Sequence, residues 1–110
     1  MAGTFEIYTD KGDEYRFRLK SSNGQVVLSS EGYKSKASAQ NGVESVQTNC
    51  ADGSCFDRAT TDSGKFRFNM KAKNRQVIGT SQSYDSESAR DNGIEAVARA
   101  AQGAKVVDLT

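Results

Sequence analysis

Histidine, proline and tryptophan are absent from this 110-residue chain, and cysteine occurs only twice. Without histidine, the chain lacks the commonest general base and the commonest metal ligand of proteins. It also contains no glycine-rich phosphate loop, no nucleophile beside a histidine base and no recognisable pair of catalytic carboxylates. We therefore expect neither an enzyme nor a protein that carries a metal or another cofactor.

Excess charge and long apolar runs are missing as well. The 15 Lys and Arg residues outnumber the 14 Asp and Glu residues by one, so no long-range field that attracts nucleic acid or an anionic membrane is expected. No segment approaches the roughly 20 consecutive apolar residues of a membrane span. Residues 1–6 lack the basic leader and apolar run of a secretory signal. These features predict a cytoplasmic protein without membrane contact.

What the sequence does contain is an internal repeat. A shift of 51 positions, which places Phe5 on Phe56, aligns the two halves without a gap. Identical pairs at this spacing include Phe17 and Phe68, Tyr33 and Tyr84, Ser35 and Ser86, Asn41 and Asn92, and Gly42 and Gly93. Such a series indicates a tandem duplication. We assign residues 4–53 to the first repeat and 54–110 to the second, within a single domain spanning 1–110.

Each repeat is predicted to form three strands and then a helix. Residues 15–20 and 66–71 alternate apolar and polar side chains, which is the period of a half-buried strand. Shorter strands are expected at 5–8 and 26–28, at the equivalent places of the second repeat, and again at 104–109. Asn23-Gly24 favours a tight hairpin, and its equivalent, Asn74-Arg75, retains the Asn. Residues 54–60 are expected to close the first repeat and to open the second.

The helices are predicted from their caps and apolar stripes. Ser35 and Ser86 stand where an N-cap hydroxyl is expected, and small apolar residues follow at helical spacing. Glycine inside a helix costs about 1 kcal/mol relative to alanine, so Gly42 and Gly93 indicate close approach to the sheet or to the twin helix. The tyrosine that precedes each helix is expected to anchor the helix start on the core.

The fold class that follows is α+β. It consists of two tandem β(3)-α-β units that share one antiparallel sheet of about seven strands, with both helices on one face. Because the chain already holds two units, we expect a monomer with internal pseudo-two-fold symmetry.

Four motifs, each with a second copy, carry a family resemblance over essentially the whole chain. They are Tyr15–Lys20, Asn23–Val27, Ser30–Tyr33 and Asn41–Val46, with their second copies. Together they resemble the YegP-like family of small bacterial proteins. The resemblance implies that the C-terminal strand is exchanged between the units, so that residues 106–109 pair with the other half. No established activity or catalytic residue comes with it.

Two sets of polar residues are candidate sites. The first is a basic face opposite the apolar side of the strands, formed by Arg16, Arg18, Lys20, Arg67 and Lys71. It would hold a phosphate group, nucleic acid or an acidic protein segment, although cross-strand pairing with carboxylates such as Glu6 and Asp57 is the interpretation we favour. The second is a polar pocket near the pseudo-dyad, formed by Asn41, Glu44, Asn92 and Glu95. For these residues too, a structural role is favoured.

Cys50 and Cys55 lie in the connection between the repeats. In a reducing compartment they are expected to remain thiols, with a regulatory disulfide as the alternative. No histidine or further cysteine is present to complete a zinc site.

Two functional hypotheses remain. The first is a non-catalytic module that binds a protein or an anionic ligand of unknown identity through the basic face. The second is a nucleic-acid binder that uses the same face, which the balanced charge disfavours.

Overall fold

The computed structural model describes residues 3–50, 53–72 and 75–110, and its elements follow the repeat. The first repeat forms β1 (Thr4–Thr9), β2 (Tyr15–Lys20), β3 (Val26–Ser30) and α1 (Lys36–Asn49). A 3-10 turn, η1 (Gly53–Cys55), leads to β4 (Phe56–Thr60), β5 (Phe66–Lys71), β6 (Val77–Thr80), α2 (Glu87–Ala101) and β7 (Lys105–Asp108). The predicted order of elements is confirmed, while Asn74 of the second hairpin lies outside the described residues.

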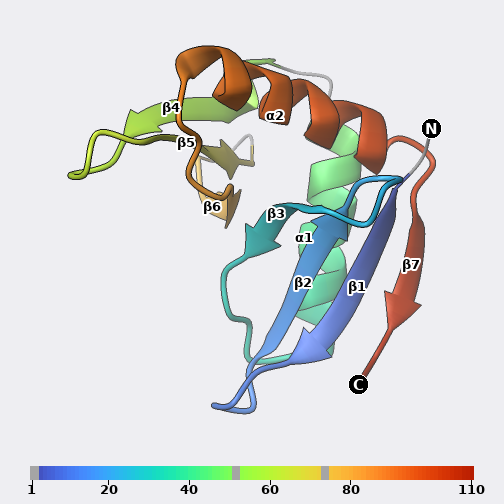
Figure 1. Ribbon diagram of the computed structural model, residues 1–110. Helices are drawn as coiled ribbons and strands as arrows, with labels where there is room; N and C mark the ends of the chain where they lie inside the picture. The colour runs from blue at the N-terminus through green and yellow to red at the C-terminus, as the bar shows by residue number, and fades with distance from the viewer. Residues whose placement is uncertain (1–2, 51–52, 73–74) are drawn as a thin grey trace.

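The strands form one sheet in the order β4-β5-β6-β3-β2-β1-β7, as can be followed in Figure 1. The two halves join where β3 pairs antiparallel with β6, with Ser29 opposite Thr80. At the far edge β7 of the second repeat pairs with β1 of the first, so the exchanged C-terminal strand is confirmed. The expectation that residues 54–60 also close the first repeat is wrong, because β4 pairs with β5 of its own repeat at the end of the sheet.

One direction in the sheet differs from the prediction. The pairing of β7 with β1 is parallel, from Thr4 opposite Lys105 to Ile7 opposite Asp108, so the sheet is mixed and not wholly antiparallel. The reason lies in α2, which carries the chain back to the start of β1. There Gly3 N–H donates to the Ala100 carbonyl at 2.8 Å. From this point β7 runs alongside β1 in the same direction.

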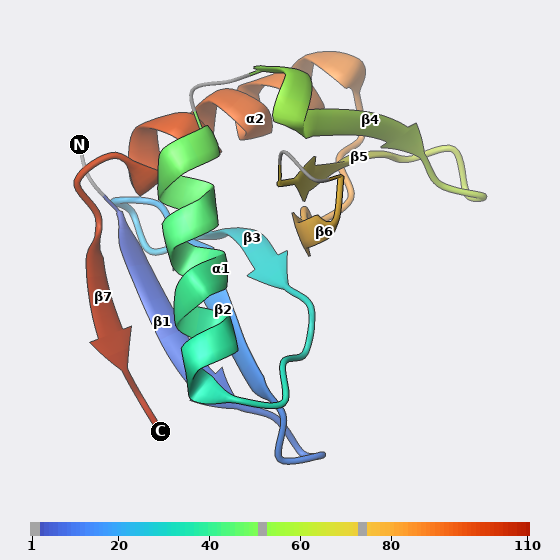
Figure 2. The same cartoon turned by 180° about the vertical axis from the view of Figure 1, so that it is seen from behind.

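Both helices pack on the same face of the sheet, and Figures 1 and 2 show α1 from its two sides, behind and then in front of β1 and β2. Their starts are capped as predicted, since the Ser35 and Ser86 hydroxyls accept from Ser38 N–H and Ala89 N–H, each at 3.1 Å. In the described part of the chain, neither helix has both the length and the apolar character needed to cross a bilayer.

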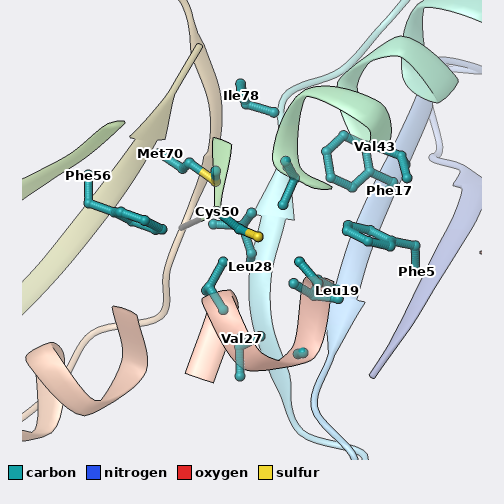
Figure 3. Close-up of a cluster of buried hydrophobic side chains, with 14 of the residues drawn as sticks. Phe5, Phe17, Leu19, Val27, Leu28, Val43, Cys50, Phe56, Met70 and Ile78 are labelled. Atoms are coloured by element: carbon teal, nitrogen blue, oxygen red, sulfur yellow. The ribbon is translucent and has the colours of Figure 1, made fainter. Parts of the chain in front are cut away.

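The core repeats with the sequence. Phe5 meets Phe17 edge to face at a centroid distance of 5.9 Å, and their equivalents Phe56 and Phe68 do so at 5.7 Å. Phe17 and Phe68 are both fully buried, and Figure 3 shows side chains of both halves gathered in this core. The duplication therefore built two halves with equivalent interiors.

The tyrosines before the helices pack onto this core, as expected. Tyr33 stacks on Phe17 at 6.4 Å, and Tyr84 stacks on Phe68 at 6.3 Å. Each tyrosine also explains a helical glycine. A Cβ on Gly42 would lie 2.7 Å from Phe17 Cε2 and 2.8 Å from the Tyr33 hydroxyl, and one on Gly93 would lie 2.7 Å from Tyr84 Cζ. The close neighbour of each helical glycine is therefore the tyrosine that precedes the helix. In the first repeat, Phe17 of the sheet is a second close neighbour.

Candidate functional site

The helices leave the other face of the sheet open, and the predicted basic side chains lie on it. On β2, Arg16, Arg18 and Lys20 alternate with buried Phe17 and Leu19. On β5, Arg67 and Lys71 alternate with buried Phe68 and Met70 in the same way. The strand order places β3 and β6 between these two groups. The five cations therefore share one face but form two separate clusters.

In the first cluster, a carboxylate on the neighbouring strand already holds two of the cations. Glu6 Oε1 accepts from Arg18 Nε at 2.7 Å and lies 3.2 Å from Lys20 Nζ. The hydrogen bond from Arg18, assisted by Lys20, lowers the pKa of the Glu6 carboxyl. The Arg18 guanidinium also lies 4.7 Å from the centre of the Tyr8 ring. One face of this ring, the nearest aromatic surface for a nucleic-acid base, is therefore covered by the protein's own arginine.

Arg16 is engaged in holding the fold together. Its Nε lies 2.6 Å from Asp10 Oδ2 in the β1–β2 turn, and its Nη1 donates to the Ser30 carbonyl of β3 at 3.3 Å. The bond from Arg16 lowers the pKa of Asp10. Arg16 thus ties a turn to a strand, which is the structural role favoured from the sequence.

The second cluster is less fully paired. Lys71 forms an ion pair with Asp57 of β4, which repeats the pairing of Lys20 with Glu6. Arg67 is exposed and makes no ion pair with any residue in the ranges that the structure describes. The reason is a substitution in the turn, where Thr61 stands in the place that Asp10 holds in the first repeat.

A shallow depression of about 590 Å³ opens on this face where β1, β7 and the β2–β3 hairpin meet. Lys20 from β2 and Lys105 from β7 both border it, together with Glu6 and the hydroxyl-bearing residues Ser21 and Ser22. Lys105 was not among the predicted cations, because its place beside Thr4 depends on the pairing of β7 with β1. Residues 105–108, Lys-Val-Val-Asp, do not alternate in polarity, so the sequence carried no signal for the side that Lys105 faces.

The predicted polar pocket does not form around the pseudo-dyad. Asn41, Glu44, Asn92 and Glu95 are all exposed, on two different helices. Their positions follow from the helical period, because the buried glycine stripe faces the sheet and turns these neighbouring side chains toward solvent. The Glu95 carboxylate lies 3.8 Å from Arg99 on the same helix. The pocket is therefore corrected to two solvated helix surfaces.

The two cysteines are buried and are not joined by a disulfide. Burial raises the pKa of the Cys50 thiol, which keeps it protonated and a poor nucleophile. In the part of the chain that is described, no three His, Cys, Asp or Glu side chains gather as a metal site would require.

A charged cluster on the helix side of β4 was not predicted. Asp91 of α2 lies 2.9 Å from Arg58 Nε and 3.3 Å from Arg90 Nε, and the hydrogen bond from Arg58 lowers its pKa. The Arg90 guanidinium lies over the Phe66 ring at 5.7 Å. The predicted sites came mainly from residues that both halves share. Arg58, Asp91 and Arg90 are not shared, because the first repeat has Ile7, Gln40 and Ala39 at the equivalent positions.

Comparison with known proteins gives a consistent family. A model described as a domain of unknown function (DUF1508) matches twice, over residues 10–57 and 62–108. The chain is 57% identical to the UPF0339 protein in the ptx operon 5' region of Stutzerimonas stutzeri, over 99% of this chain and 98% of that protein. It is 43% identical to the UPF0339 protein YegP of Escherichia coli K12, over 88% of each chain.

Solved structures agree with this fold. The solution NMR structure of YegP from E. coli, a protein of unknown function, matches with a TM-score of 0.95 at 41% identity, covering 100% of this chain and 95% of that one. The solution NMR structure of a UPF0339 protein from Shewanella oneidensis matches with a TM-score of 0.94 at 44% identity, covering 100% and 93%. The chain therefore belongs to the UPF0339 family and contains two matches to this domain of unknown function.

Proposed function

We propose that the protein is a non-catalytic binding module, monomeric and cytoplasmic, that holds an acidic segment of a partner protein on its open sheet face. The centre of the binding surface is the depression between Lys20 and Lys105. One observation carries the proposal: at this end of the face three cations, Arg18, Lys20 and Lys105, stand against the single carboxylate of Glu6. A carboxylate-bearing ligand would balance the remaining positive charge.

Two features support a protein ligand over nucleic acid. The Arg18 guanidinium covers one face of Tyr8, which leaves less aromatic surface for a base to stack on. The carboxylates of Glu6, Asp10 and Asp57 neutralise most of the cations, which leaves only isolated positive charges on a face that nucleic acid would meet with a charge at every nucleotide. Phosphate-driven binding relies on several lysines and arginines without such neutralisation.

The test is a titration followed by amide chemical shifts. A decapeptide of glutamate, a single-stranded oligonucleotide and a duplex are added in parallel, each at low and at physiological salt. The glutamate peptide is expected to shift amides of β1, β2 and β7 around the depression. The double variant Lys20→Ser/Lys105→Ser should weaken this binding by about four- to 25-fold, at roughly two- to five-fold for each exposed ion pair.

The matched control is Lys11→Ser/Lys34→Ser, which removes the same charge from exposed loop positions outside the depression. It should leave the affinity for the glutamate peptide within about two-fold, the effect of general charge alone. Equal losses in both double variants would contradict a site at the depression. Tighter binding of an oligonucleotide with a steep salt dependence would replace the proposal with nucleic-acid binding.

A further inference from the structure

The two edges of the sheet are not equivalent, although the two repeats are. Strand β1 opens the first repeat and is covered by β7, whereas β4 opens the second repeat and is the end strand of the sheet. Within residues 3–50, 53–72 and 75–110, no segment pairs with this second edge. Residues 54–57, which correspond to β7 at the repeat spacing, already form the end of η1 and the start of β4.

The outer edge of β4 presents backbone groups in the geometry that β7 uses on β1. Leu109 N–H, just beyond β7, donates to the Ile7 carbonyl at 2.8 Å. Arg58 corresponds to Ile7 and has the same pairing inside the sheet, opposite Phe68 as Ile7 is opposite Phe17. The Arg58 carbonyl and N–H therefore point away from β5, toward the open edge.

The helix flank of each edge indicates which side chains a docked strand would meet. At the β1 edge, Val106 of β7 borders a depression of about 390 Å³ with Ile7 and Val43. The residue of α2 that corresponds to Val43 is Ile94, which is also buried and apolar. A strand seated on β4 in the same way would thus place an apolar side chain beside Ile94.

The charge at the start of the helix is reversed between the edges. At the β1 edge, Asp108 of β7 forms an ion pair with Lys36, the first residue of α1. The first residue of α2 is Glu87, which is exposed and makes no ion pair within the described ranges. Arg58 nearby is already paired with Asp91. The complement to this end of the β4 edge is therefore a basic side chain.

In the two registers centred on its charged residues, a second copy of the chain fits this edge poorly. An antiparallel pair of β4 strands centred on Arg58 would set two arginines opposite each other, and one centred on Asp57 would do the same with two aspartates. Like charges directly opposite each other destabilise strand pairs, and charged edges of this kind discourage self-association.

We propose that the outer edge of β4 binds an extended segment of a partner protein, parallel to β4 as β7 is to β1. The segment carries an apolar residue beside Ile94 and a basic residue two positions later, opposite Glu87. This mode is strand addition, in which backbone hydrogen bonds supply affinity and alternate side chains supply specificity. This surface is distinct from the depression at Lys20 and Lys105, so a negative result at one surface leaves the proposal for the other unchanged.

The probe is a peptide with the sequence of residues 104–110 carrying Asp108→Lys, capped at both ends and titrated against the full chain. Saturable amide shifts are expected in β4 and in the first turn of α2. The Lys peptide should bind about two- to five-fold more tightly than the unchanged Asp peptide, the effect of one exposed ion pair. In a Glu87→Lys variant, which copies the Lys36 arrangement, this order should reverse.

Two variants of one residue separate backbone pairing from side-chain effects. Arg58→Pro removes the outward N–H at an edge position that tolerates proline, and should abolish binding. Arg58→Ile copies the first repeat, keeps the N–H and should retain binding. Shifts confined to β1 and β7 would mean that the peptide displaces β7, and would overturn the proposal. A preference for Lys or Asp that stays unchanged in Glu87→Lys would also overturn it.

Discussion

Ile7 and Arg58 occupy the same position of the repeat, on strands that pair with their neighbours in the same register. Ile7 is 1% exposed, because β7 and α1 cover it, whereas the Arg58 side chain on the end strand is 49% exposed. In the uncovered half, an apolar contact has been replaced by the ion pair of Arg58 with Asp91. A neighbouring strand, and not the local β-structure, therefore decides which side chain this position accepts.

Exchanging the two residues tests this comparison most severely. Ile7→Arg would bury a cation where Gln40, not a carboxylate, stands in the place of Asp91, and should lower the free energy of unfolding by about 3–5 kcal/mol. Arg58→Ile loses only an exposed ion pair and should change it by about 1 kcal/mol or less. Urea denaturation measures both. Equal effects would mean that covering by β7 is irrelevant to the choice of residue.

The helical glycines give a smaller contrast between the halves. Gly42→Ala meets the fully buried Phe17 ring, which cannot move aside, so overpacking should outweigh the gain in helix propensity and destabilise by about 1–2 kcal/mol. Gly93→Ala meets the Tyr84 ring just as closely, at 2.7 Å from Cζ, but this ring is half-buried and can shift toward solvent. This variant should lie within about 1 kcal/mol of the parent, since the two effects nearly cancel. Thermal and urea unfolding of the two variants provide the measurement, and a larger loss at Gly93 would contradict it.

The ion pair at the covered edge should give the smallest effect, visible as a pH dependence. Hydrogen bonds from Lys36 and Thr110 lower the pKa of Asp108 from 3.8 to about 2. A carboxyl with a lowered pKa in the folded state adds stability above its unfolded pKa and loses it as the pH falls through the folded pKa. The Tm of Asp108→Asn should therefore lie below that of the parent at pH 5 and converge with it near pH 2.

Lys36→Met provides the partner control for this measurement, because it removes the main cause of the lowered pKa. The Tm of Lys36→Met should also lie below that of the parent at pH 5, and should approach it as the pH falls to about 2. A Tm difference for Asp108→Asn that persists unchanged at pH 2 would show that the side chain acts by packing and not by charge.

Much of this architecture follows from local patterns that the two halves share. Alternation in residues 15–20 and 66–71 predicted the central strands, and the paired serines predicted both helix caps. The basic face was predicted because its side chains oppose the buried phenylalanines. The polar pocket was not formed, since shared residues such as Asn41 and Asn92 point away from the sheet.

The features that were missed depend on contacts between distant segments. Lys105 reaches the open face because β7 pairs with β1, and Arg58 is exposed because no described segment pairs with the outer edge of β4. Neither contact leaves a periodic signal in the sequence, and residues unique to one repeat carry no internal comparison.

Two equivalent units, with their strands, helix caps and aromatic cores, follow from the amino-acid sequence, because they depend on side-chain periodicity and on residues that recur at one spacing. The tertiary structure alone decided the parallel direction of β7, the separation of the cations into two clusters and the open edge at β4. The physical reason is that one connecting segment cannot both close the first unit and open the second. The sheet formed by the described residues therefore has one edge covered by β7 and one edge, at β4, without a neighbouring strand.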